Sequence, residues 1–133
     1  MRMNKIQVSG KKLLSILWIY LTLNYIFCDV FTLMFSEELR MVLQGKMGDI
    51  LITQEFLLTF AIIMEIPMMM IILSRILSYK LNRTLNIIFG ILLTIIQASS
   101  LFTGSNTMHY IFFSIIEISI TLFIAWYAWK WKE

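Results

Sequence analysis

Residues 13–35 read LLSILWIYLTLNYIFCDVFTLMF, a run of 23 residues in which Asp29 carries the single charge. About 20 apolar residues suffice for a helix to cross a hydrocarbon core of about 30 Å. The run is too long for the hydrophobic region of a signal peptide, and no small-residue cleavage motif follows it. Because lipid offers no water to backbone amides, the run predicts a retained transmembrane α-helix.

Three further apolar stretches follow at residues 56–78, 85–102 and 110–129, and each is long enough to span a bilayer. Hydrophobic residues make up 59% of the chain. Charged residues make up 14%, against about a quarter in an ordinary soluble domain. We therefore predict a single membrane domain over residues 1–133. The expected fold class is all-α integral membrane, an antiparallel bundle of four transmembrane helices.

The longest loop, residues 36–55, predicts a short amphipathic helix on the outer membrane surface. Ser36 can cap this helix, and two glutamates follow in its first turn, where the helix dipole favours negative charge. Gly45 and Gly48 are expected to end it.

The lysines and arginines predict the orientation in the membrane. Nine of the eleven lie at the N-terminus, around the second loop or at the C-terminus, whereas Arg40 and Lys46 lie in the first loop. Since positively charged loops stay in the cytoplasm, we expect both termini there. The anchors expected at this cytoplasmic interface are Arg75, Lys80, Arg83, Trp126 and Trp129.

Each predicted span carries one strongly polar side chain in its outer half. At about 1.5 Å per residue, Asp29 lies about 9 Å deep and Glu65 about 14 Å. Gln97 lies about 8 Å deep and Glu117 about 11 Å. Because intramembrane acids usually face a bundle interior or a wet cavity, we expect one shared site. The residues expected to bind a ligand or a proton there are Asp29, Glu65, Glu117, Gln97, Tyr25 and Tyr110.

The expected occupant of this site carries positive charge. No basic residue is placed to neutralise the acids, so a proton, a metal ion or an organic cation is the natural partner, and tyrosines add aromatic faces. Pro67 follows Glu65 by two positions and would act as a hinge, since it frees the carbonyl of Ile63. Two plainer interpretations stay open: a tolerated membrane proline, and acids that serve only as hydrogen-bonding contacts between helices.

Several activities are excluded by what the chain lacks. One cysteine and one histidine cannot supply an internal disulfide, a redox pair or a thiolate zinc cluster. No HExxH, GxSxG or P-loop pattern is present, and the basic residues lie next to the membrane rather than in a nucleic-acid-binding region. We predict no catalytic residue, no enzyme activity, no cofactor and no nucleic acid partner.

Two functions fit these residues. The first is a small polytopic membrane protein that binds or transports a proton, a cation or a small cationic or lipophilic ligand in an acidic cavity of the outer half. Four short helices enclose little volume, so a transport path would need a homo-oligomer. The alternative is a non-catalytic accessory or structural membrane subunit, whose acids pair with basic residues of a partner protein.

Four stretches carry a resemblance to a known family: LNYIFCDVF around Asp29, FAIIMEIPMMMIILSRILSYKLNR around Glu65, NIIFG at residues 86–90, and IFFSIIEISITLFIAWYAWKW around Glu117. Together they resemble a family of small four-helix bacterial inner-membrane proteins catalogued as a domain of unknown function. More distantly, the architecture is similar to DoxX-type membrane proteins. The resemblance implies four spans and a bacterial inner (cytoplasmic) membrane, and it implies no activity.

Overall fold

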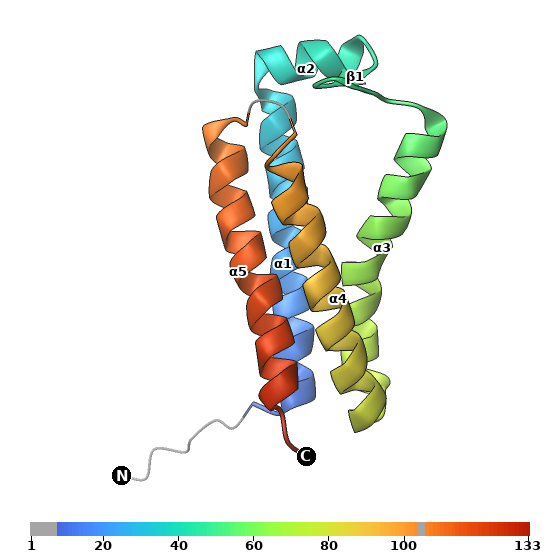
Figure 1. Cartoon of the computed structure of the whole chain (residues 1–133), viewed down its shortest axis with the longest axis vertical. Coiled ribbons are helices and arrows are strands. Elements are labelled where there is room, and N and C mark those ends of the chain that lie inside the picture. Colours follow the sequence, from blue (N-terminus) through green and yellow to red (C-terminus); the bar gives the residue numbers. More distant parts are fainter. Residues whose placement is uncertain (1–7, 104–105) are drawn as a thin grey trace.

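The computed structural model describes residues 8–103 and 106–133. In these residues the chain forms five helices and one small hairpin (Figure 1). The elements are α1 (Gly10–Met34), α2 (Ser36–Leu43), β1 (Lys46–Met47), β2 (Ile50–Leu51), α3 (Gln54–Ile76), α4 (Tyr79–Ser100) and α5 (Met108–Lys130). The helices α1, α3, α4 and α5 are long and apolar enough to cross a membrane, which confirms the predicted fold class.

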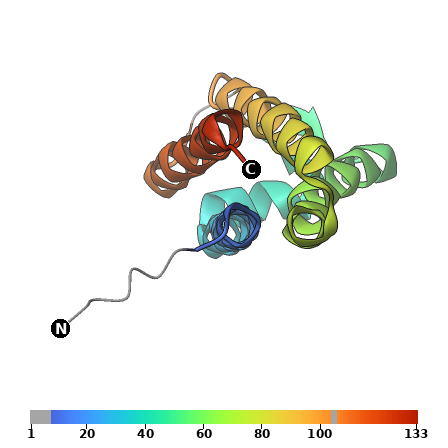
Figure 2. The same cartoon turned by 90° about the horizontal axis from the view of Figure 1, so that it is seen from below.

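The four long helices form a ring in the order α1, α5, α4, α3 when viewed along the bundle (Figure 2). Helix α5 packs along both α4 and α1, and α3 packs mainly along α1. Each helix runs antiparallel to both of its neighbours in the ring, so the start of α1 and the end of α5 lie at the same end of the molecule (Figure 1). The short helix α2 lies across the other end.

Helix α4 begins six residues before the predicted span at residues 85–102, because its first turns are polar and hydropathy alone does not detect them. These turns hold the end of α5. Tyr79 donates a hydrogen bond of 2.6 Å from its hydroxyl to the carbonyl of Trp131. Arg83 donates from Nε and Nη2 to the carbonyls of Ala128 and Trp129, at 3.0 and 2.9 Å. A cation on the last carbonyls of a helix satisfies acceptors that have no partner within the helix.

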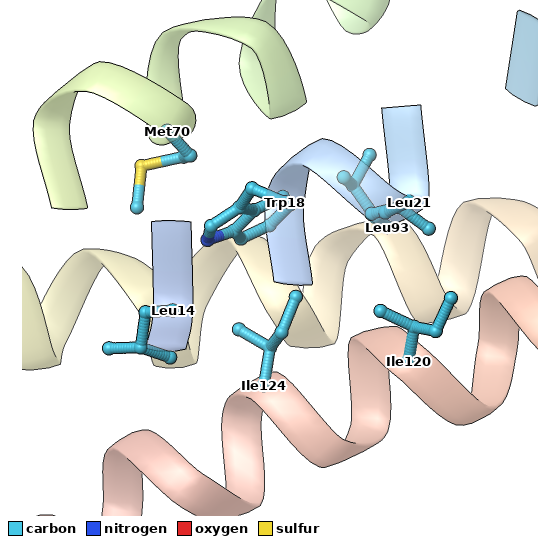
Figure 3. Packing of buried hydrophobic residues seen from close by; sticks show 7 residues of the cluster. All are labelled: Leu14, Trp18, Leu21, Met70, Leu93, Ile120 and Ile124. Atoms are coloured by element: carbon cyan, nitrogen blue, oxygen red, sulfur yellow. The ribbon is translucent and has the colours of Figure 1, made fainter. Parts of the chain in front are cut away.

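The hydrophobic core takes residues from all four long helices. Figure 3 shows its buried members side by side: Leu14, Trp18, Leu21, Met70, Leu93, Ile120 and Ile124. Helix α3 contributes buried residues only from Pro67 onward, namely Pro67, Met70 and Ser74. Its first half buries none of its residues and leans away from the other helices in Figure 1.

The predicted short helix of the first loop is present as α2, with Glu37 and Glu38 in its first turn. The expected cap at Ser36 is wrong, because Ser36 is already the first helical residue and Phe35 holds the N-cap position without a side-chain hydrogen bond. Gly45 follows the helix with a φ of 75°, a backbone conformation that glycine adopts without strain. Gly48 has a φ of 58° and lies in the two-residue turn between β1 and β2. The hairpin was not predicted, because strands of two residues are too short to show alternation.

Candidate functional site

A cavity of about 180 Å³ lies among α1, α3, α4 and α5, toward the end that α2 covers. Its polar lining comes from Tyr25, Asp29, Gln97, Ser100, Tyr110 and Glu117, together with the thiol-bearing Cys28. Its apolar lining comes from Phe60, Ile63, Met64, Leu93 and Ile96. The structure thus brings five of the six residues predicted to bind a ligand to one cavity, and the sixth, Glu65, lies elsewhere.

Glu117 is the most unusual side chain of this cavity. Only 1% of it is exposed, and its Oε1 atom is buried without a hydrogen-bond partner among the residues that the structure describes. Leaving a buried polar atom unpaired costs about 1–3 kcal/mol, and more for a charged group. Asp29 lines the same cavity but is exposed. Glu117 therefore lies at the buried wall of the cavity, and Asp29 lies at its accessible edge.

Hydrogen bonds hold the other polar groups in place. Ser100 donates from Oγ to the carbonyl of Gln97 at 2.7 Å, and the same Oγ lies 2.6 Å from the Tyr110 hydroxyl. Since a serine hydroxyl carries one proton, Tyr110 must be the donor of the second bond. The Tyr110 oxygen keeps lone pairs for a further donor. Gln97 in turn donates from Nε2 to the Ser114 Oγ at 2.8 Å.

This donor set disfavours a metal ion. Among residues 8–103 and 106–133, no group of three or more His, Cys, Asp and Glu side chains could hold a metal. Calcium requires six to eight oxygen ligands, and structural zinc requires four ligands. The cavity instead combines one buried carboxyl, one exposed carboxyl, two phenol rings and an apolar wall.

Glu65 does not reach the cavity, contrary to the expectation of one site shared by all the intramembrane acids. It is exposed and lines a separate groove of about 270 Å³, together with Ile62, Ile66, Met69, Met70, Leu73 and Phe89. At about 100° per residue, Glu65 lies about 200° around α3 from the buried Pro67. The helix cannot point both residues inward, and the apolar Pro67 and Met70 occupy the inner face.

The predicted hinge, Pro67, is buried, and helix α3 continues through it. The residues of α3 before the proline pack least against the other helices.

Among the predicted interface anchors, Arg75 is exposed and donates from Nε to the Ser15 Oγ at 3.1 Å. Lys80 is exposed in the first turn of α4, and Arg83 binds the end of α5. The indoles of Trp126 and Trp129 are also exposed. The hinge and anchoring roles stay predictions.

A second polar cluster, in the half of the bundle away from α2, was missed. Trp18 donates from Nε1 to Asn86 Oδ1 at 2.7 Å, and Asn86 donates from Nδ2 to Asn82 Oδ1 at 2.7 Å. Asn82 donates to the carbonyl of Ser74 at 2.7 Å. The pair Asn82 and Asn86, one helical turn apart, was the available signal, but Asn82 precedes the predicted span. All these side chains are buried and bonded to one another, so the cluster joins helices rather than binding a ligand.

The four apolar helices and the polar cavity among them define a multi-pass helical membrane protein. The model of a family of unknown function, DUF6326, matches residues 1–133, and the chain therefore belongs to that family. No curated protein and no solved structure matches the chain, so the more distant likeness to DoxX-type proteins has no support from these comparisons.

Proposed function

We propose that this protein binds a small cationic ligand in the cavity between its four helices. The observation that carries the proposal is the Glu117 carboxyl, which is 1% exposed and whose Oε1 has no hydrogen-bond partner in the described part of the chain. A protonated amine would supply the missing hydrogen-bond donor. Ionisable side chains within membrane spans are costly and mark ligand or ion sites by default.

The size and lining of the cavity narrow the ligand. A volume of about 180 Å³ is below the roughly 300–1,000 Å³ of typical small-molecule pockets. A small alkylammonium ion fits this lining, because its charge can meet Glu117 while its methylene groups contact Ile63 and Leu93. The faces of the Tyr25 and Tyr110 rings are suited to contact a cation. The smallest cation that this cavity would bind is a proton on the Glu117 carboxyl.

The direction of access is part of the proposal. Asp29 is exposed at the edge of the cavity, near the end of α1 that leads into α2. The positive-inside distribution of lysine and arginine supports an external position for this end of the bundle and a cytoplasmic position for both termini. The proposed location is the bacterial inner membrane. Transport would in addition need a path through the other half, which the core residues Leu14, Trp18 and Met70 fill.

The test uses Cys28, which lines the cavity and is the one cysteine of the chain. The full-length protein in lipid nanodiscs is alkylated with a maleimide, with and without butylammonium as the probe, and the rate of Cys28 modification is followed by mass spectrometry. We expect the probe to slow modification of the wild type but not of Glu117→Gln. Glu65→Gln is the matched control and should keep the protection, since Glu65 lies outside the cavity.

Equal protection in the wild type and Glu117→Gln would contradict the cationic-ligand proposal. A proton that the protein carries across the membrane would appear instead as a proton flux. The protein in liposomes that contain a pH-sensitive dye would then dissipate an imposed pH gradient, and Glu117→Gln would abolish the dissipation. The same liposomes, loaded with labelled butylammonium, separate transport from binding alone.

An accessory subunit is the second candidate, and one observation favours it. Glu65 is a carboxyl on the outward face of a membrane helix, where a partner protein could supply a basic residue. This function predicts that affinity purification in a mild detergent recovers a second protein in a fixed ratio. Recovery of this chain alone favours the ligand-binding function.

A further inference from the structure

Helix α3 carries a regular exposed stripe on its outward face. The stripe consists of residues separated by four, three, four, three and four positions: Leu58, Ile62, Glu65, Met69, Ile72 and Ile76. All six side chains are exposed, and they lie opposite the buried Pro67, Met70 and Ser74. Alternating steps of three and four keep the same side of a helix against a second helix over several turns.

Glu65 needs a hydrogen-bond partner within the membrane, whereas the apolar residues of the stripe do not. It lies near the middle of α3, about 14 Å from the start of the apolar stretch, where lipid provides no hydrogen bond. The basic residues in the described part of the four spans lie near their ends. The nearest along α3 is Arg75, ten residues or about 15 Å away. Among the residues that the structure describes, no basic side chain is therefore placed to pair with Glu65, and a second chain can supply the partner.

We propose that a second copy of this chain packs against the α3 stripe, so that Glu65 meets Glu65 of the second copy. Two copies inserted in the same orientation are related by an axis along the membrane normal, which makes their α3 helices parallel and places equal residues at equal depth. A carboxyl group is a partner for its own kind, because a protonated carboxyl donates a hydrogen bond to the other. The stripe is thus complementary to itself.

The shape of the surface supports a side-chain-filled interface. The groove of about 270 Å³ beside the stripe shares Ile62, Glu65 and Met69 with it and reaches Phe89 of α4. In parallel helix pairs each stripe residue inserts between residues of the facing helix. The groove offers space for such insertion next to Glu65. A single polar residue within an apolar interface of this kind fixes the register of the two helices. The dimer does not depend on ligand binding at Glu117.

Cysteine cross-linking tests the position of the interface. In a Cys28→Ser background, Met69→Cys lies on the stripe, and Met68→Cys, its neighbour about 100° around the helix, lies off it. Both native side chains are exposed, at 47% and 41%, so they are a matched pair. With copper phenanthroline as oxidant in native membranes, we expect dimers from Met69→Cys at least about tenfold more than from Met68→Cys, since disulfides need Cα atoms within about 7 Å. Equal cross-linking, or none from Met69→Cys, would overturn the proposal.

Substitution of Glu65 tests the pairing itself. Glu65→Gln should keep the dimer, because an amide also donates to and accepts from its own kind. Glu65→Leu should weaken association by about 3- to 30-fold, the range for one interhelical hydrogen bond in a membrane. Association is measured by energy transfer between labelled copies in vesicles of neutral lipid. A Gln variant as weak as the Leu variant would overturn the self-pairing and point to a basic residue of another protein. The Cys28 protection assay on the same variants reports the Glu117 site separately.

Discussion

Glu117 and Glu65 lie in opposite environments of the same bundle. Glu117 is 1% exposed at the wall of the inner cavity, whereas Glu65 is exposed on the outward face of α3 and lines a different groove. The two cavities share no lining residue, so we expect that each carboxyl can be changed without altering the surroundings of the other. Substitutions at distant sites that share no partner have additive effects on stability, so the two sites can be tested singly and together.

Glu117→Leu should stabilise the protein in the absence of ligand. The substitution replaces a buried Oε1, which has no partner within residues 8–103 and 106–133, with an apolar group. We expect it to raise the free energy of unfolding by about 1–3 kcal/mol. Thermal unfolding in detergent, followed by circular dichroism, measures the effect, and Ile116→Leu on the same helix is the control. A lower melting temperature would mean that the Glu117 carboxyl holds helices together and is not reserved for a ligand.

Trp18→Phe should destabilise the buried cluster of α1, α3 and α4. The variant keeps most of the ring but removes the donor that bonds Asn86 Oδ1 at 2.7 Å. A buried acceptor that loses its main partner costs about 1–3 kcal/mol. The measurement is unfolding of Trp18→Phe, Asn86→Leu and the double variant. We expect the double variant to lose less than the sum of the two single losses, whereas strict additivity would show that the bond is unimportant.

Gly90→Leu should prevent close packing of α4 on α5. A Cβ at Gly90 would already lie 3.0 Å from the Thr121 carbonyl oxygen and 3.1 Å from the Ala125 Cβ, so a larger side chain must push the helices apart. Overpacking of this kind costs about 1–3 kcal/mol or more. Ile91→Leu is the control, since Ile91 is exposed next to the glycine. Equal melting temperatures for the two variants would contradict the close approach.

Arg83→Met should loosen the end of α5. The variant removes both hydrogen bonds to the carbonyls of Ala128 and Trp129 and the cation that favours a helix C-terminus. We expect about tenfold faster hydrogen exchange at the backbone amides of residues 127–130, corresponding to about 1.4 kcal/mol. Lys80→Met removes a charge from the same region and should leave the exchange unchanged. Similar acceleration in both variants would mean that net charge, and not the hydrogen bonds, is responsible.

The parts of the site that could be predicted lie on helices with a polar side. Asp29 shares a helical face with hydroxyl and aromatic residues, and Gln97 and Glu117 share faces with hydroxyls, so helical periodicity predicts that all three face the bundle interior. Helix α3 has no such polar side. Around Glu65 the nearby faces carry residues such as Ala61, Met68 and Ile72, and periodicity gives no direction when every side is apolar.

The sequence by itself determined the number of long apolar helices, their antiparallel order and the position of each polar residue along its helix. Run length against bilayer thickness and the need to satisfy the backbone in lipid leave little choice. Only the tertiary structure decided which acids meet. That outcome depends on how each helix is rotated about its own axis, and rotation is set by side-chain packing between helices. Packing of Pro67 and Met70 against the core turns Glu65 outward, whereas packing of Ile120 and Ile124 leaves Glu117 facing the cavity.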